Sequence, residues 1–260
     1  MKIALAQLNS VVGDICGNVE KILQFARQAK EKGADLIATG HYSRIKDGEL
    51  YKGLDESKDQ SYFLYRVESK ALKRSLMPIG EYKKSEVRLM AKKRNLYTSD
   101  KKDSQGICFV GEVGIKEFLT HELGPQKPGD ILDDHEKNIG RHDGAIFYTI
   151  GQRHGLNVGG GLPYYVSKKD MKNNIVYVTT DLNNASLWRR EIQLSDVHWI
   201  NQEPKKSQEI EVRLRYRGPL IKTRFEDNKL KLSEPARGIA AGQSAVIYKD
   251  DEVLGGGIIT

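Results

Sequence analysis

One of the two cysteines of the chain sits where its thiol could be reactive. Cys108 lies in the segment DSQGICFVG (residues 103–111), between glycines and just before a helix predicted at residues 113–121. A helix N-terminus carries about half a positive charge, which lowers the pKa of a nearby thiol and favours the thiolate. A buried structural cysteine is the alternative, because free cysteine is among the most buried residue types. The spacing alone leaves both interpretations open.

A second candidate site follows the strand predicted at residues 34–39. Ligands of open α/β sheets bind just beyond the carboxyl ends of the strands. In the segment ATGHY (residues 38–42), Gly40 would let a nucleotide approach the backbone closely, and His41 could donate a hydrogen bond to it. An ordinary turn from strand to loop fits the same residues, so the segment alone does not decide.

Residues 55–64 combine charged, amide and aromatic side chains in a way that suits contact with RNA. In order along the chain, these side chains are Lys58, Asp59, Gln60, Tyr62 and Phe63. The same residues also fit a solvated helix N-terminus, with Ser57 as the cap and Gln60 as its capping-box partner. On local grounds the helix N-terminus is the better explanation.

Two further stretches place basic side chains where they could meet a phosphate backbone. The glycine-rich segment TIGQRHGLNVGGG (residues 149–161) contains Arg153 and His154 but lacks the Gly-Lys-Ser/Thr of a phosphate-binding P-loop. Arg213, Arg215 and Arg217 occupy alternate positions, which predicts a basic stripe on one face of a strand. A solvated strand face explains the three arginines equally well.

The composition limits the classes of protein to which the chain can belong, but it does not indicate one function. The 260 residues carry a formal net charge of +7 and are 38% hydrophobic, which allows a buried core and favours phosphate-bearing partners. Two cysteines are too few for a disulfide scaffold and point to a reducing cytoplasm. No run approaches the roughly 18 apolar residues of a membrane span, so we expect no membrane partner.

The hydrophobic pattern predicts an α/β region followed by a mostly β region. A core strand at residues 1–8, a helix at 18–32 and a strand at 34–39 would form a β-α-β unit with a parallel sheet. Further helices are predicted at residues 62–75, 84–93 and 113–121. Beyond about Gly124, short β-prone runs separated by turn residues predict one or two small antiparallel barrels. These runs are residues 145–150, 164–166, 175–179, 209–216, 221–225, 229–232 and 244–249.

Seven ordered segments together resemble the tRNA-specific 2-thiouridylases, from about residue 33 to residue 260. The segments are ATGHY, GLDESKDQSYFL, MPIGEYKKSEVR, KKDSQGICFVG, YTIGQRHGL, VRLRYRGP and AGQSAVIY followed by LGGGII. The resemblance implies a Rossmann-like ATP-pyrophosphatase domain with a parallel sheet, a small central domain and a C-terminal antiparallel β-barrel. We expect an opening unit at residues 1–37, part of the ATP-pyrophosphatase domain at 38–122, the central domain at 123–190 and the barrel at 191–260.

The same resemblance implies an activity, the ATP-dependent 2-thiolation of a wobble uridine in tRNA. In that family ATP, with Mg²⁺, adenylates O2 of the uridine and pyrophosphate is released. A cysteine persulfide then delivers sulfur to C2, and a second cysteine helps to release the sulfur by forming a disulfide bond. The implied partners are tRNA and a protein that donates sulfur, either a persulfide carrier or a cysteine desulfurase.

Individual residues match positions that have roles in this family. Cys108 matches the cysteine that bears the persulfide, in agreement with the thiolate predicted from its setting. Gly40 matches a glycine that contacts the nucleotide, and His41 matches a neighbouring residue that is important for activity. Gln243 matches a residue that the last barrel contributes near the active centre. The positions that match tRNA-contacting residues are Lys58, Asp59, Gln60, Arg215 and Tyr216.

The first part of the chain departs from this family. The Ser-Gly-Gly-x-Asp-Ser loop, whose backbone N–H groups cradle the pyrophosphate of ATP, occurs nowhere in these 260 residues. The Asn-Pro-Asp context of the family's first catalytic cysteine is also absent. Residues 1–37 resemble instead the start of the nitrilase-like amidohydrolases, especially glutamine-dependent NAD synthetases. Cys16 could replace the first cysteine only if it comes within disulfide reach of Cys108.

We therefore expect a tRNA-uridine 2-sulfurtransferase by descent. The alternative is a non-catalytic protein that keeps the tRNA-binding surface but cannot adenylate the uridine. An amidase is the least favoured function, because the Pro-Glu that carries the amidase glutamate is missing and no lysine or cysteine follows in the right setting.

Overall fold

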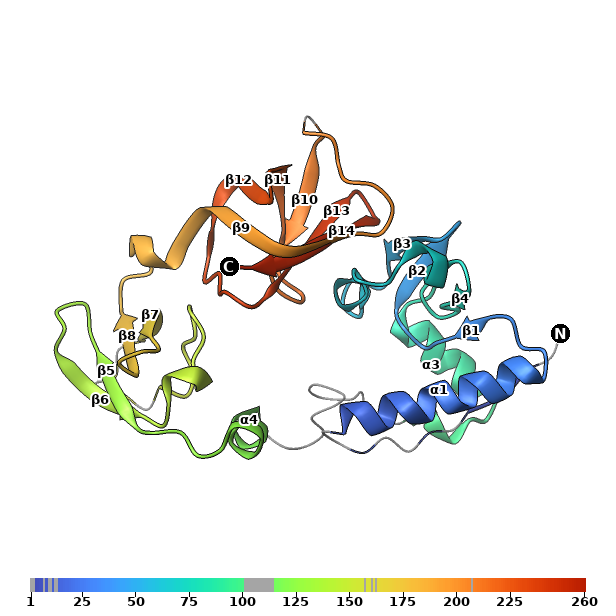
Figure 1. The fold of residues 1–260 in the computed structure, drawn as a ribbon, viewed down its shortest axis with the longest axis horizontal. Helices are drawn as coiled ribbons and strands as arrows, with labels where there is room; N and C mark the ends of the chain where they lie inside the picture. Colours follow the sequence, from blue (N-terminus) through green and yellow to red (C-terminus); the bar gives the residue numbers. More distant parts are fainter. Residues whose placement is uncertain are drawn as a thin grey trace.

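The structure is a computed structural model that describes residues 3–6, 8, 11, 14–100, 115–156, 158–159, 161, 163–206 and 208–260. The chain forms three regions that lie along an arc (Figure 1). The last region in the sequence, a β-barrel, lies between the other two. The helical region at the start of the chain lies on one side of the barrel, and a small sheet from the middle of the chain lies on the other.

The first helix forms where its periodicity predicts it. Helix α1 (Ile15–Glu31) begins after the N-cap Asp14, whose carboxylate accepts the backbone N–H of Gly17 at 2.8 Å. The helix ends before Gly33, which takes a φ of 88°, a conformation that glycine adopts at little cost. No residue of α1 is buried, and its apolar side chains are exposed, Leu23 by 47%.

The strand predicted at residues 1–8 does not form among the residues described there. Residues 3–6 have no strand partner, and Leu5 is 93% exposed. The parallel pairing that does form joins β1 (Ile37–Ala38) to β4 (Ser75–Leu76). An apolar run becomes a buried strand only when a neighbouring strand supplies hydrogen bonds and a covering surface. The prediction of a parallel sheet is confirmed, but with β4 as the partner of β1.

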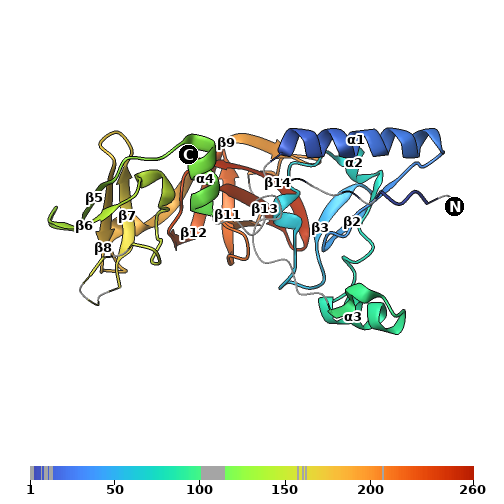
Figure 2. The ribbon, with the colours of Figure 1, turned by 90° about the horizontal axis from the view of Figure 1, so that it is seen from below.

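The predicted helix at residues 62–75 is replaced by three short elements. They are the 3-10 helix η1 (Ser61–Phe63), the helix α2 (Ser69–Leu72) and strand β4. Tyr62 and Tyr65 bury their rings against the barrel, so tertiary packing outweighs the helical periodicity of this segment. Helix α3 (Lys84–Lys93) has the predicted bounds and is followed by the 3-10 helix η2 (Tyr97–Asp100). Helices α1 and α3 lie on opposite sides of the hairpin formed by residues 43–52 (Figure 2).

A hairpin from the first half of the chain extends the sheet of the barrel. Strands β2 (Ser43–Lys46) and β3 (Glu49–Lys52) join through Asp47 and Gly48, whose φ angles of 53° and 85° are those of a type I′ turn. Strand β3 pairs with β14 near the chain end, with Leu50 opposite Val253. The local sequence pattern does not predict this hairpin, because its strands are short and rich in charged residues.

The middle of the chain forms a small sheet preceded by a helix. Helix α4 (Ile115–Leu123) is followed by β5 (Gly129–Leu132), β6 (Asn138–His142), the 3-10 helix η3 (Ala145–Phe147), β7 (Tyr165–Asp170) and β8 (Ile175–Thr179). The strand order is β6-β5-β8-β7, and only the β5–β8 pairing is parallel. Ile131, Val166, Val176 and Val178 form the centre of its core. The strand predicted at residues 145–150 is the 3-10 helix η3 instead.

The last region is a closed antiparallel barrel, as predicted. After the 3-10 helix η4 (Ala185–Leu187), its strands are β9 (Trp188–Trp199), β10 (Ile210–Arg213), β11 (Leu220–Glu226), β12 (Lys229–Arg237), β13 (Ser244–Lys249) and β14 (Glu252–Ile259). The order is β13-β10-β11-β12-β9-β14, and the pairing of β13 with β14 closes the ring. Gly255 is required here, since a Cβ at this residue would lie 2.1 Å from the carbonyl oxygen of His198.

Apolar side chains fill the barrel and also join it to the first half of the chain. The inner cluster includes Ile192, Val212, Leu230 and Ile247. A second cluster packs residues of the first half against the outside of the barrel: Leu50, Tyr62, Tyr65 and Leu72 contact a surface made by Ile200, Val246, Tyr248 and Val253. Within the described part of the chain, no helix is both long and apolar enough to cross a membrane.

Candidate functional site

The loop that follows β3 is built around the carboxylate of Asp59. This carboxylate accepts the backbone N–H groups of Gly53 and Ser61 and the hydroxyl of Ser61, each at 3.0 Å. The two backbone N–H groups donate to Oδ1, whereas Oδ2, which accepts the Ser61 hydroxyl, also lies 3.0 Å from Nη1 of Arg213. Asp59 is only 3% exposed, and its carboxylate holds the loop against the barrel. Contact of Asp59 with tRNA stays a prediction.

Arg213 is the barrel's contribution to this ion pair. Its side chain is only 13% exposed, and its guanidinium carbon lies 5.4 Å from the centre of the Tyr248 ring. Burial raises the pKa of Tyr248 to about 12, so the phenol stays neutral beneath the cation. This pairing is not predicted by the sequence pattern, because Asp59 and Arg213 are 154 residues apart and nothing local to either residue indicates the other.

The basic stripe predicted from three alternating arginines does not form. Strand β10 ends at Arg213, and the chain then turns, with a φ of 60° at Arg217. The guanidinium of Arg215 donates to the backbone oxygens of Arg237 and Gly238, at 3.2 and 2.5 Å. Arg213 therefore forms an ion pair with the buried Asp59, and Arg215 is hydrogen-bonded to backbone oxygens. Arg217 is exposed.

Gln60 connects the same loop to Tyr42, the residue just before strand β2. Its side-chain oxygen accepts the backbone N–H of Tyr42 at 3.0 Å, and its own N–H donates to the carbonyl of Tyr42 at 3.0 Å. The expected capping box does not form, since the N–H and hydroxyl of Ser57 both donate to Asp55. Lys58 lies between these anchored residues and is partly buried.

Three aromatic rings gather where the loop meets the barrel. The ring centres of Phe63 and Tyr216 are 4.5 Å apart, and those of Tyr62 and Phe63 are 5.5 Å apart at an edge-to-face angle of 89°. Tyr62 is anchored, since its hydroxyl donates to the carbonyl of Ser244 at 2.8 Å. Phe63 remains 60% exposed, and the guanidinium carbon of Arg217 lies 5.0 Å from the Tyr216 ring.

Gln243 lies beside this aromatic cluster, one residue before Ser244. Its backbone oxygen accepts the N–H of Ile259 at 2.8 Å, which ties it to the end of the barrel. Its side-chain oxygen is buried and finds no hydrogen-bond donor among the described residues. A buried acceptor without a donor costs about 1–3 kcal/mol, so this oxygen is available to a ligand if the side chain turns.

Gly40 and His41 follow the carboxyl end of β1. The Thr39 hydroxyl and Nδ1 of His41 are 3.0 Å apart, and burial lowers the pKa of His41, so its imidazole is neutral at pH 7. A Cβ built on Gly40 would meet only Ile79, at 4.0 Å, which leaves room for a flat ligand. No group of three or more metal-ligating side chains occurs in the described ranges. These residues fit one edge of a nucleotide, but they do not make a phosphate cradle.

Of the two cysteines, only Cys16 lies among the described residues. Cys108 lies outside the described residues, so its predicted position before a helix stays a prediction. Cys16 is a free, exposed thiol in the first turn of α1, close to the N-cap Asp14. The replacement of the family's first cysteine by Cys16, which requires disulfide reach to Cys108, therefore stays a hypothesis.

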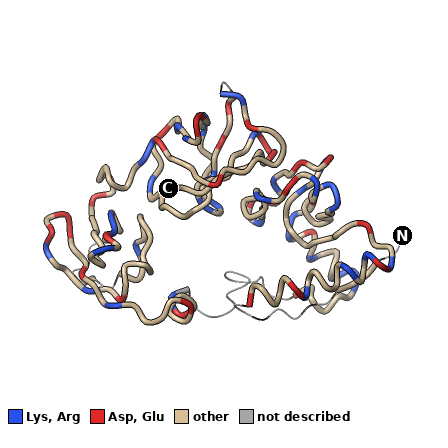
Figure 3. The backbone as a smooth tube through the Cα atoms, viewed as in Figure 1, with Lys and Arg blue, Asp and Glu red and all other residues tan. Residues whose placement is uncertain are grey.

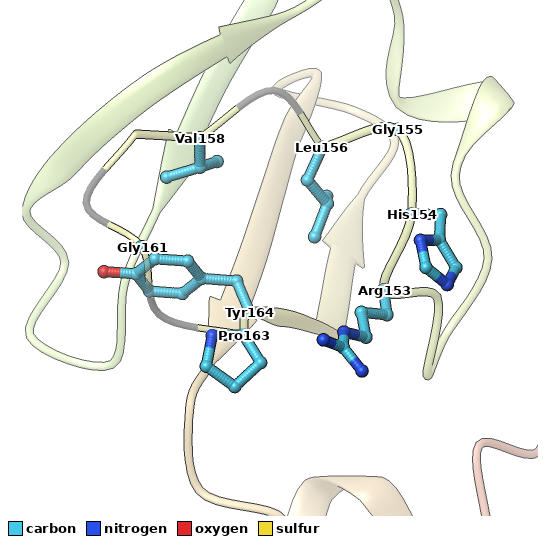
Figure 4. Close-up of a pocket in the computed structure, with 8 residues that line it drawn as sticks. All are labelled: Arg153, His154, Gly155, Leu156, Val158, Gly161, Pro163 and Tyr164. Atoms are coloured by element: carbon cyan, nitrogen blue, oxygen red, sulfur yellow. The ribbon is translucent and has the colours of Figure 1, made fainter.

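The glycine-rich stretch predicted to bind phosphate lines a cavity of about 300 Å³. Figure 4 shows Leu156 and Val158 pointing toward the space that the loop encloses, with Arg153 and His154 on one side and Tyr164 on the other. The mixture of an arginine, an aromatic ring and aliphatic side chains suits a flat group that carries negative charge. Phosphate binding by this loop stays a prediction.

Charged residues are spread over the whole backbone. Figure 3 shows Lys and Arg interspersed with Asp and Glu in each of the three regions. The net charge of +7 is therefore not concentrated in one continuous stretch of backbone. The specific contacts of the loop, the arginines and the aromatic rings identify the candidate site better than net charge does.

Comparisons with known proteins cover nearly the whole chain. Three family models match in order: a tRNA methyl transferase HUP domain at residues 13–112, a tRNA methyl transferase PRC-barrel domain at 116–180 and an aminomethyltransferase beta-barrel domain at 189–259. The protein of Francisella philomiragia named tRNA-specific 2-thiouridylase MnmA is 42% identical over 261 residues, which cover 94% of this chain and 72% of that protein. Proteins of the same name from Geobacillus thermodenitrificans and Pseudomonas aeruginosa are also 42% identical, over 94% of this chain and 69% of theirs.

The chain belongs to the MnmA family of tRNA-specific 2-thiouridylases. The family predicted from seven segments is thereby confirmed. The MnmA-family match starts earlier than those segments suggested, at residue 13 in place of about residue 33. It includes α1 and Cys16, most of the stretch that also resembles the nitrilase-like amidohydrolases.

Proposed function

We propose that this chain acts in the 2-thiolation of a uridine in tRNA and binds tRNA where the loop after β3 meets the barrel. The observation that carries the proposal is the joining of two segments far apart in sequence. Both match tRNA-contacting stretches of the family, one at residues 58–60 and the other at 215–216. The Asp59–Arg213 ion pair and the Phe63–Tyr216 contact hold them side by side.

Each of the matched residues has a distinct role in this proposal. Lys58 and Gln60 contact tRNA from a loop that the buried Asp59 positions. Arg215 and Tyr216 contact it from the barrel side. Gln243 offers its unpaired amide oxygen to a donor of the target nucleotide, and its place beside the aromatic cluster supports this role.

The sulfur chemistry is proposed to run through the two cysteines. Cys108 carries the sulfur as a persulfide, and the terminal sulfur attacks C2 of the activated uridine. The thiolate of Cys16 then attacks Sγ of Cys108, so that the sulfur–sulfur bond breaks and a Cys16–Cys108 disulfide forms while the sulfur stays on C2. The bond from C2 to O2 breaks and AMP leaves with O2. A thiol reductant returns both cysteines to thiols before the next turnover. The exposure of Cys16 and its inclusion in the HUP-domain match support this role.

ATP and Mg²⁺ belong to the proposal as co-substrates of the uridine's activation. Adenylation would turn O2 of the uridine into a leaving group. Gly40 and the neutral imidazole of His41 suit an edge of the nucleotide. Gly40 and His41 account for this edge alone, since the Ser-Gly-Gly-x-Asp-Ser loop that holds the pyrophosphate of ATP in the family does not occur in these 260 residues.

The direct test is thiolation of unmodified tRNA by the purified chain with ATP, Mg²⁺, and a cysteine desulfurase with cysteine, which delivers sulfur at the persulfide level. The product, 2-thiouridine, is measured by mass spectrometry of the digested tRNA. We expect product with the wild-type chain and none with Cys108→Ala. Cys16→Ala should lower product formation in each turnover, because no thiolate then breaks the sulfur–sulfur bond, but it should leave tRNA binding unchanged. Product that persists in Cys108→Ala would contradict the assignment of the persulfide to this residue.

The alternative function is tRNA binding without catalysis, by a chain that keeps the joined loop and barrel segments. If this function is the correct one, the chain binds tRNA tightly but neither consumes ATP nor forms 2-thiouridine, even with a sulfur-donating protein added. Measuring ATP turnover in the thiolation mixture separates the two functions.

A further inference from the structure

Phe63 is the most exposed of the three clustered rings, although it is a large apolar side chain. It is 60% exposed, whereas Tyr62 beside it is 8% exposed. Exposure of an aromatic ring to water has a free-energy cost, about 25 cal/mol for each Å² of apolar surface. The ring lies next to two segments that match tRNA-contacting stretches, so tRNA is the candidate ligand for its exposed surface.

The ring is held in place by its neighbours. Tyr62 meets it edge-to-face, and the hydroxyl of Tyr62 is hydrogen-bonded to the carbonyl of Ser244 in strand β13. Tyr216 packs on Phe63 at 4.5 Å between ring centres, with an angle of 45° between the planes. A ring that is fixed before binding loses little conformational entropy when a ligand stacks on it.

The surroundings of the ring carry positive charge. Arg217 is exposed, and its guanidinium carbon lies 5.0 Å from the centre of the Tyr216 ring. Arg215, two residues before Arg217 in the sequence, donates to the backbone oxygens of Arg237 and Gly238. Asp59 of the same loop is buried and paired with Arg213. An exposed aromatic surface flanked by arginines has the chemistry that unpaired nucleotides recognise.

We propose that Phe63 and Tyr216 form a stacking platform for an unpaired base of tRNA, with Arg217 at the adjoining phosphate. This inference rests on the proposed function, and it adds a stacking residue to the polar stretches assigned there. Bases of single-stranded RNA stack on aromatic rings in a way that tolerates any base, since every base has a flat π surface. The platform therefore strengthens binding of an unpaired loop without choosing its sequence.

The test measures binding of an unmodified tRNA transcript to the full chain as a function of salt. The variants are Phe63→Ala, Phe63→Leu and Phe63→Trp, with Arg217→Ala for the phosphate contact. Met171→Ala is the matched control, because Met171 is an apolar residue with a similar exposure, 54%, at the turn between β7 and β8. Thermal unfolding of each variant checks that the barrel is intact.

Stacking predicts a pattern that simple packing does not. Phe63→Ala and Phe63→Leu should weaken binding about 5- to 100-fold, the loss expected for one stacked base, whereas Phe63→Trp should bind as tightly as wild type. The slope of binding against salt should stay unchanged in the Phe63 variants and fall in Arg217→Ala, since only the arginine releases a counterion. A transcript with 2-aminopurine in an unpaired loop should lose fluorescence on binding wild type, and less on binding Phe63→Ala.

Three outcomes would overturn the platform. If wild type binds tRNA and Phe63→Ala binds within twofold of it, the platform is wrong and the proposed function stands. If Phe63→Leu binds as wild type does, the site accepts aliphatic packing, which points to a protein partner in place of a base. If wild type binds no tRNA, the proposed function and the platform fail together.

Discussion

The C-terminal barrel and the helix α1 are both amphipathic, yet they bury their apolar residues to very different extents. Inside the barrel, Val212, Leu230 and Ile247 are completely buried, whereas no residue of α1 is. A sheet that closes on itself covers its own inner face, but a helix depends on another element to cover its apolar stripe. The barrel therefore completes a core within one segment of the sequence, and α1 does not.

Among the described residues, most buried apolar side chains of the first half of the chain lie where it contacts the barrel. Leu50 and Leu72 are completely buried, and Tyr62 and Tyr65 nearly so, all in the cluster against the outer surface of β13 and β14. The same segment carries the Asp59–Arg213 ion pair and the aromatic cluster. The candidate RNA face is therefore built on the rigid barrel, and we expect its geometry to depend on the barrel more than on α1.

The largest expected effect compares one leucine from each region. Leu230→Ala removes a completely buried side chain from the barrel and should lower the free energy of unfolding by about 2–5 kcal/mol. Leu23→Ala removes a side chain that is 47% exposed in α1, and should change it by no more than about 0.5 kcal/mol. Urea unfolding followed by tryptophan fluorescence measures both. Equal losses would mean that α1 is packed as firmly as the barrel.

The next effect concerns the ion pair that joins the loop to the barrel. Arg213→Met leaves the carboxylate of Asp59 buried without its cation and should destabilise the chain by about 3 kcal/mol. Replacing both partners, as Asp59→Asn with Arg213→Met, should restore part of this loss. Lys206→Met serves as the control, because Lys206 pairs with Glu226 on the surface and its loss should leave unfolding unchanged. A single variant with wild-type stability would show that the loop does not depend on this pair.

A pH effect distinguishes the middle region from the barrel. The backbone N–H of Gly144 donates to Nδ1 of His142 at 2.9 Å, and burial lowers the pKa of His142 below its ordinary value of 6.5. Between the lowered and the ordinary pKa, the unfolded chain takes up a proton and the folded chain does not, so stability falls as the pH falls through 6.5.

His142→Asn should remove part of this acid sensitivity, since Asn can accept the same N–H but does not titrate. Unfolding measured from pH 7.5 to pH 5 gives the slope for wild type and variant. The charged neighbours Asp130, Arg141 and Asp143 are kept in both proteins, so their contribution cancels. Identical slopes would contradict the role of His142.

The smallest effect concerns the ionic attachment of the hairpin. Asp251 lies 2.9 Å from Arg44 and 3.1 Å from Lys52, and the hydrogen bond from Lys52 is the largest of the interactions that lower its pKa. Its carboxylate is 60% exposed, so Asp251→Ala should cost less than about 1 kcal/mol. The contribution is present above the ordinary pKa of the carboxyl and is lost as the pH falls through the lowered one. A larger loss in the unfolding assay would mean that the hairpin is held mainly by charge.

The sequence predicted those elements whose own pattern determines them. Helices α1 and α3, strands β8 and β13 and the closed barrel follow from local periodicity and turn residues such as Asp227 and Asn228, which both adopt positive φ. Ordered segments predicted the family. The strand at residues 1–8, the helix at 62–75 and the hairpin β2–β3 were mispredicted or missed, because their conformations depend on partners distant in the sequence.

The candidate site could be predicted only in part, for the same reason. Segments 58–60 and 215–216 were singled out by residue type, but their proximity depends on a pair of residues 154 positions apart. The burial of Asp59 and Arg213 could not be inferred from spacing, since charged residues are usually exposed. Alternation of arginines predicted a strand face, but the chain leaves the strand at Arg213.

The central claim is that two distant segments form one RNA face on the barrel. Photo-crosslinking of the chain to tRNA that contains 4-thiouridine, with peptides identified by mass spectrometry, tests it most directly. We predict crosslinks in both residues 53–66 and residues 214–219, and a parallel decrease in both when Arg213→Met separates the loop from the barrel. Crosslinks confined to α1 or to strands β5–β8, with neither of these segments labelled, would contradict the account.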